Sequence, residues 1–98
     1  MNGDKRDIGL QVIYDVMDER TRQDKKWGEQ NHSDEKWLSV LVEEVGEAAQ
    51  AINKLYVDPV REQSTNDTDK WQTNLENEVI EIAAVAIAWV ECRRRNRA

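Results

Sequence analysis

The chain has one cysteine and one histidine among its 98 residues. Because Cys92 is alone, an intramolecular disulfide and a Cys-x-x-Cys metal site are excluded, and we expect this thiol to pack as a small apolar group. The scarcity of both residue types disfavours zinc, and it disfavours a di-iron bundle built on Glu-x-x-His pairs. No apolar run approaches the roughly 20 residues that a membrane-spanning helix needs, so we expect no membrane partner. No signal peptide is visible, and the expected compartment is the cytoplasm.

Glycine and proline are also scarce, with four and one in the chain, and no alternating run of β-branched residues predicts a strand. Helical periodicity instead predicts three helices: roughly Lys5 to Gln23, the N-cap Ser33 to about Val57, and about Asp69 to Arg95. Pro59 cannot continue the second helix, and the segment DPVREQSTNDTD is typical of a loop. We therefore expect one all-α domain, a helical bundle over residues 1–98.

Acidic side chains outnumber basic ones, and the formal net charge is −6. This balance argues against a protein that binds nucleic acid through phosphate contacts. The basic tail, with Arg93, Arg94, Arg95 and Arg97, is explained by the preference of a helix C-terminus for cations. With 39% apolar residues in so short a chain, a single small core is marginal, and we expect self-association.

The second helix carries acids on its apolar face. At about 100° per residue, Glu44 falls at the centre of this face and Glu47 close to its edge. The apolar members of the face are Trp37, Val40, Leu41, Ala48, Ala51, Ile52 and Leu55.

The third helix repeats this pattern, with Glu78 inside its apolar stripe and Glu81 at the border. The stripe consists of Leu75, Val79, Ile82, Ala86, Trp89 and Val90. In an antiparallel pair, the acids of the two helices could meet across the bundle.

Carboxylates in a protein interior cost several kcal/mol unless a cation or a hydrogen-bond network compensates them. Neither stripe contains an obvious lysine or arginine partner. A divalent metal is the remaining compensation, and sites made only of carboxylates suit Mg²⁺ or Mn²⁺. Acids around such hard cations usually serve phosphate chemistry.

The sequence resembles the MazG-like, all-α nucleotide pyrophosphohydrolases, whose signature is E-E-x-x-E followed by E-x-x-D. The resemblance rests on EEVGE (Glu43, Glu44 and Glu47), on EVIE (Glu78 and Glu81), and on the preceding KWGEQNHSDEKW, and it covers roughly residues 20 to 92. Two departures are present: Glu81 stands where the family usually has aspartate, and the gap between the half-motifs is on the long side.

The resemblance implies a four-helix core completed by homo-oligomerisation, as a dimer or a tetramer that is a dimer of dimers. It also implies Mg²⁺-dependent hydrolysis of (deoxy)nucleoside triphosphates to monophosphate and pyrophosphate, in nucleotide-pool house-cleaning, with Mn²⁺ as a substitute metal. Glu43, Glu44 and Glu47 would be catalytic and would bind the metal together with Glu78 and Glu81. The attacking water would lose its proton either through the metal alone or to a glutamate acting as general base.

Four further residues are candidates for substrate binding: Trp27, Gln30, His32 and Lys54. Trp27, in a polar segment, either stacks on the base or caps the end of the bundle. Gln30 and His32 offer hydrogen bonds to the base edge or sugar, and Lys54 offers a cation to the phosphates. Two other functions remain open: a non-enzymatic helical interaction module, and a related enzyme that acts on phosphoribosyl-ATP.

Overall fold

The computed structural model describes residues 5–57 and 65–97, which are mostly helical and contain no strand. The elements are α1 (Lys5–Trp27), α2 (Asp34–Ile52), a π-helical turn η1 (Asn53–Val57) and α3 (Thr65–Asn96). The predicted all-α class is confirmed. The predicted break at Pro59 lies outside the described residues. None of the described helices is long and apolar enough to cross a membrane.

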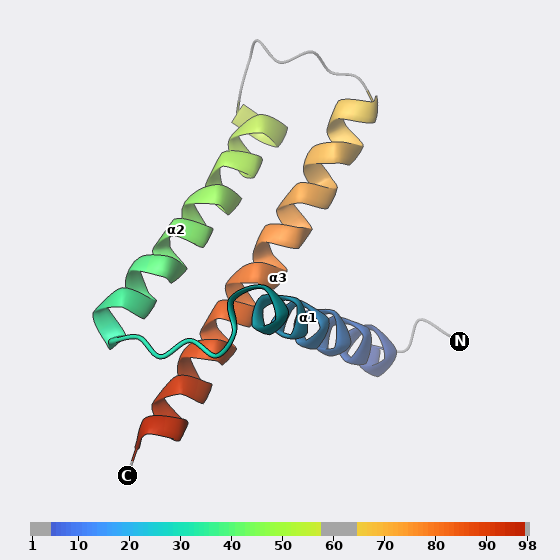
Figure 1. Ribbon diagram of the computed structural model, residues 1–98. Helices are drawn as coiled ribbons and strands as arrows, with labels where there is room; N and C mark the ends of the chain where they lie inside the picture. The colour runs from blue at the N-terminus through green and yellow to red at the C-terminus, as the bar shows by residue number, and fades with distance from the viewer. Residues whose placement is uncertain (1–4, 58–64, 98) are drawn as a thin grey trace.

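Helices α2 and α3 lie side by side and run in opposite directions, whereas α1 packs against α3 (Figure 1). The C-terminal end of α1 lies against the antiparallel pair of α2 and α3, which we call the hairpin, and its N-terminal end points away from this pair (Figure 1). Arg20 joins α1 to α3, because its buried guanidinium donates a hydrogen bond from Nε to the Glu91 carboxylate of α3 at 3.1 Å.

Ser33 is the N-cap of α2, as predicted: its hydroxyl accepts a hydrogen bond from the backbone N–H of Lys36 at 3.2 Å. The predicted end near Val57 also holds, although the last turn is π-helical. The predicted start of α3 at Asp69 is four residues too late, because the helix begins at Thr65. Thr65 to Thr68 were assigned to the loop for their turn-forming composition, a preference that the helical context overrides.

The predicted end of α1 at Gln23 is also wrong, since the helix continues to Trp27. Gly28 ends it, with a φ of 73° and with its N–H donating to the Asp24 carbonyl at 2.8 Å. This is the left-handed C-terminal cap that glycine adopts without a steric cost. Trp27 is therefore the last helical residue and does not belong to the loop.

The core lies between the start of α2 and the end of α3. Trp37 is 2% exposed and packs with Val85, Ala88 and Cys92, which confirms the core roles expected for Trp37 and Cys92. The predicted stripe of α3 is partly wrong, because Val79 and Val90 are exposed. Small residues line the buried face instead, since they let α2 approach closely.

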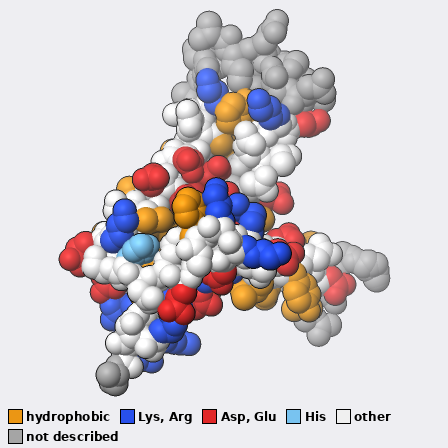
Figure 2. All heavy atoms as spheres, viewed as in Figure 1, with side chains coloured by type: hydrophobic (Ala, Val, Ile, Leu, Met, Phe, Trp, Pro, Cys, Tyr) orange, Lys and Arg blue, Asp and Glu red, His pale blue; other side chains and the backbone are white. Residues whose placement is uncertain are grey.

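The apolar stripe of α1 is largely uncovered. Of the apolar residues that recur at helical spacing along α1, only Val16 is buried, whereas Ile8, Val12, Ile13 and Met17 are exposed. Figure 2 shows hydrophobic side chains gathered over the free end of this helix.

Candidate metal centre and adjoining cavity

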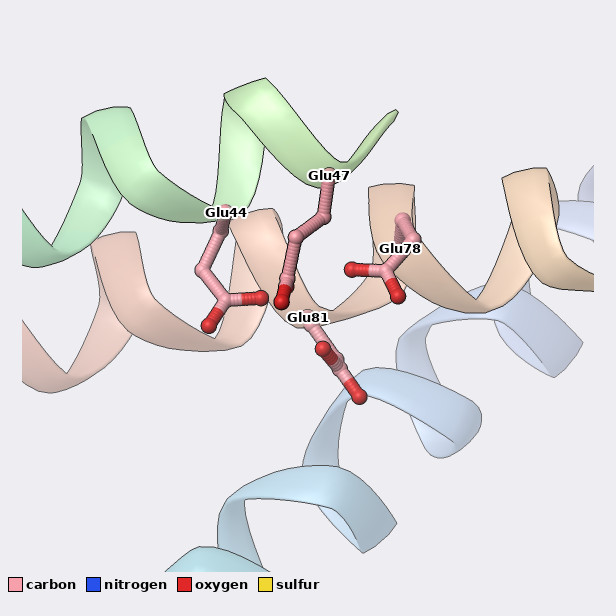
Figure 3. A group of neighbouring side chains, drawn as sticks. All are labelled: Glu44, Glu47, Glu78 and Glu81. Carbon is pink, nitrogen blue, oxygen red and sulfur yellow. The ribbon is translucent and has the colours of Figure 1, made fainter. Parts of the chain in front are cut away.

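Four glutamates meet where the middle of α2 faces α3. Glu44 and Glu47 come from α2, and Glu78 and Glu81 come from α3; one carboxylate oxygen of each lies within 4.8 Å of the others. In Figure 3 the side chains converge from the two helices, and the Glu81 carboxylate points toward α1. The i, i+3 spacing in each helix places both acids of a pair on one face, as the sequence predicted.

The donor set fits a hard divalent cation. All four groups are carboxylates, the ligands that Mg²⁺ and Mn²⁺ prefer. Glu44 Oε2 and Glu78 Oε2 are buried and have no hydrogen-bond partner. Among the side chains that the structure describes, those of residues 7–56 and 69–97, no lysine or arginine forms an ion pair with any of the four. A bound cation would supply the interactions that these oxygens lack.

Burial and the neighbouring carboxylates raise the pKa values of two of the four glutamates. Burial raises the pKa of Glu44 to about 8, and the nearby Glu81 and Glu47 carboxylates add to the rise. Burial also raises the pKa of Glu78 to about 7, with Glu81 and Glu47 contributing. Crowded carboxylates hold protons because neighbouring negative charges repel one another. A divalent cation would displace these protons.

Two residues expected in the site lie elsewhere. Glu43 is exposed on α2 and is not one of the four clustered glutamates. Lys54 is in η1 and does not line the cavity next to the cluster. The i, i+3 pairs alone converge, because Glu43 precedes Glu44 by about 100° on the helix and projects to another side.

A cavity of about 1120 Å³ adjoins the glutamates, between the end of α1, residues 28–33, α2 and α3. Glu44 and Glu81 form part of its wall, so the cavity and the cluster are continuous. The cavity also brings together the predicted substrate residues Trp27, Gln30 and His32. Trp27 is 61% exposed, so a ligand can reach its ring.

The C-terminal end of α3 holds the segment that carries Gln30 and His32. Arg95 donates to the Gln30 carbonyl at 3.0 Å, and Asn96 donates to the Asn31 side chain at 2.8 Å. The His32 ring meets the buried Trp37 ring edge-on, with 4.9 Å between centroids. The basic tail, explained from sequence by the helix dipole alone, therefore also orders one wall of the cavity.

The cavity is lined by cations to which the sequence analysis gave no role in the site. They are Arg20, Arg22 and Lys26 of α1, Lys36 of α2, and Arg94 and Arg95 of α3. The sequence offered a signal for two of them only: Arg22 and Lys26 are one helical turn apart and therefore share a face of α1.

Comparisons of the chain with protein-family models, with curated proteins and with solved structures found no match. The molecule is therefore described by its class, an all-α protein with a four-glutamate cluster beside a large cavity.

Proposed function

We propose that this chain is a MazG-like, Mg²⁺-dependent pyrophosphohydrolase that cleaves (deoxy)nucleoside triphosphates to monophosphate and pyrophosphate. The observation that carries the proposal is the continuity between the glutamates and a cavity with an accessible tryptophan. A nucleotide needs both: a metal site for its phosphates and an aromatic surface for its base.

Glu44, Glu47, Glu78 and Glu81 would hold the metal, and Mn²⁺ would be a substitute. The chemistry that bound Mg²⁺ supplies is neutralisation of phosphate charge and activation of the phosphorus toward water. Gln30 and His32 would hydrogen-bond the base or the sugar, and Trp27 would stack on the base. A cluster carboxylate left without a metal bond would accept the proton of the attacking water. We infer a role in nucleotide-pool house-cleaning, in the cytoplasm.

The decisive experiment is a screen for pyrophosphate release over canonical and modified (deoxy)nucleoside triphosphates, with Mg²⁺ and with excess EDTA. We expect release in Mg²⁺ and none in EDTA. Full activity in EDTA would exclude the metal-dependent reaction. Cleavage of phosphoribosyl-ATP alone would favour that related enzyme, and absence of turnover on every substrate would favour a helical interaction module.

We also propose that the chain forms a homo-oligomer, a dimer or a dimer of dimers, in which α1 packs against a second copy. The radius of gyration is 16.2 Å, compared with about 13 Å expected for a compact domain of this length. Side chains on α1 such as Ile8, Ile13 and Met17 are exposed, which disfavours an isolated monomer.

Light scattering at micromolar concentration tests the assembly. We expect the mass of a dimer or tetramer, and a lower mass for Ile13→Glu, which places a charge on the exposed apolar face that the second copy would bury. Lys25→Glu changes a residue of the same helix near its other end and should leave the mass unchanged. A fully active monomer would contradict this proposal.

A further inference from the structure

The last two turns of α1 place cations on the wall of the same cavity as two of the glutamates. Arg22 and Lys26 both line the cavity, as do Glu44 and Glu81. Arg20 lies on the same helix but cannot bind a ligand in the cavity, because it is buried and hydrogen-bonded to Glu91. Arg22 and Lys26 are therefore the α1 cations that a ligand can reach.

Arg22 lies close enough to the cluster to interact with it electrostatically. Hydrogen bonding to Glu19 is the main cause of the raised pKa of Arg22, and the charge of Glu81 also contributes. Nε of Arg22 lies 2.8 Å from one Glu19 oxygen, and NH2 lies 2.6 Å from the other. The Arg22 side chain is 55% exposed, whereas that of Glu19 is 13% exposed, so breaking this pair would leave a largely buried carboxylate unpaired. Nη1 of Arg22 takes no part in the pair and is the nitrogen that can donate a charge-assisted hydrogen bond to a phosphate.

Lys26 lies one turn further along α1, toward the end of the cavity that holds Trp27. Its Nζ is 4.9 Å from the centroid of the Trp27 ring. Within the described part of the chain, Lys26 has no ion-pair partner. Its charge therefore remains available to an anion that lies between the tryptophan and the glutamates.

The cavity thus presents three features in order: an aromatic ring, a row of cations and a set of carboxylates that would hold metal. Its volume of about 1120 Å³ is ample, since ligand pockets usually measure about 300–1,000 Å³. A ligand that meets all three must carry a base at one end and several negative charges along its length. A monophosphate has too few charges to reach both the cations and the metal.

We propose that Arg22 and Lys26 of α1 bind the triphosphate chain of the substrate, with Arg22 on the terminal phosphates and Lys26 nearer the sugar. This assignment rests on the proposed pyrophosphohydrolase function. It replaces Lys54, which the sequence suggested for the phosphates, by two residues on a different helix. Arg22 selects triphosphates over monophosphates, and the monophosphate product leaves because it lacks the terminal phosphates that Arg22 binds.

Equilibrium binding tests the assignment without turnover. The probes are the α,β-methylene analogues of the canonical deoxynucleoside triphosphates and the matching monophosphates, titrated by calorimetry in Mg²⁺. We expect Arg22→Gln and Lys26→Gln each to weaken binding of the triphosphate analogue by about tenfold to a hundredfold, the usual loss for a charge-assisted hydrogen bond. Arg22→Gln should leave monophosphate binding unchanged. Lys25→Gln is the matched control, because Lys25 is exposed and does not line the cavity.

The outcomes separate this assignment from the proposed function. If the wild-type protein binds and cleaves triphosphates while both variants bind the analogue normally, the assignment is overturned and the proposed function stands. Equal weakening of both probes by Arg22→Gln also overturns the terminal-phosphate role. If the wild-type protein binds no analogue in Mg²⁺, both proposals fail. Arg22→Lys keeps the charge, and its affinity for the triphosphate analogue should lie between those of the wild type and Arg22→Gln.

Discussion

The interface between α2 and α3 has two neighbouring stretches of opposite character. Near the start of α2, Trp37 packs with Val85, Ala88 and Cys92 in a buried apolar cluster. Two turns further along α2, the same face carries Glu44 and then Glu47, which meet the acids of α3. Burial of the apolar stretch stabilises the hairpin whatever the solution contains. The acidic stretch stabilises it only when protons or a cation remove the repulsion between carboxylates.

This difference indicates how the glutamates can be kept together without metal. The apolar stretch and the attachment of α1 through Arg20 and Glu91 hold the helices in place. These contacts do not involve the glutamates, so they can position both pairs of acids whether or not a cation is bound. If the cluster binds a metal, a site arranged in this way loses less conformational entropy on binding.

The largest expected effect comes from the apolar stretch. Trp37→Ala should lower the free energy of unfolding by about 3–5 kcal/mol, because it removes a large buried side chain and leaves a cavity. This loss is large against the roughly 5–15 kcal/mol typical of a whole domain. Thermal and urea denaturation followed by circular dichroism would measure it.

Leu38→Ala is the matched control for Trp37→Ala. Leu38 is the next residue of α2 but is 51% exposed, so its truncation should change stability by no more than about 0.5 kcal/mol. Similar losses from the two substitutions would show that the apolar cluster does not determine the stability of the hairpin.

In the acidic stretch, the expected effect is on activity. Glu44→Gln should reduce pyrophosphate release by about a hundredfold or more, since a metal ion supplies several kcal/mol of transition-state stabilisation. The apo protein should keep its fold and melt at a higher temperature, because one of the repelling carboxylates is gone.

Glu43→Gln sharpens this test. Glu43 is adjacent in sequence but exposed and outside the cluster, so its change should have only a small effect on turnover. A loss as large as that of Glu44→Gln would return Glu43 to the catalytic set that the sequence motif implies.

Much of the fold was readable from the sequence because it depends on local patterns. Helical periodicity located three helices, Ser33 marked the start of α2, and the acids at i and i+3 indicated a shared face. The buried face of α3 was placed less well, since close packing favours small residues such as Ala84 and Ala88 over the larger Val79. Hydropathy alone does not record this preference for size.

The cavity could not be derived in the same way. Arg22 and Lys26 line it because α1 crosses α3 where it does, and that crossing depends on tertiary contacts such as the Arg20–Glu91 pair. Gln30 is held by Arg95, which lies 65 positions later in the chain, and His32 is contacted by Cys92, 60 positions later. Such long-range contacts leave no periodic signal in a single sequence.

Trp27 and Trp37, which precede and follow segment 28–33 in the sequence, differ in exposure. Trp37 is buried, whereas Trp27 is exposed in the cavity, so Trp27→Ala should spare stability and raise the KM for the preferred nucleotide. The loss of a stacked base is worth about 1–3 kcal/mol, which is about fivefold to 150-fold in affinity. Gln30→Ala should flatten the preference between bases. An unchanged KM and unchanged nucleotide ranking in both variants would leave this segment with a structural role only.

The last expected effect is a pH dependence of stability that the acidic stretch should produce. The pKa of Glu44 rises from 4.5 to about 8 in the folded chain, and that of Glu78 rises to about 7. Between pH 4.5 and about pH 8 the folded state holds more protons than the unfolded state. The free energy of unfolding therefore falls as pH rises across this range. The stabilising contribution is fully present below about pH 4.5 and is lost by about pH 8.

Urea denaturation in EDTA at several pH values between 5 and 8 would measure this slope. Glu19 and Asp34, whose pKa values are lowered by hydrogen bonds to Arg22 and to Trp89 and Arg93 respectively, titrate below this range and do not disturb it. Glu44→Gln should flatten the slope, whereas Glu43→Gln should preserve it. Mg²⁺ should stabilise the protein most at high pH, where it no longer competes with protons for the carboxylates. A free energy of unfolding that stays constant or rises from pH 5 to pH 8 in EDTA would show that the four glutamates do not oppose folding.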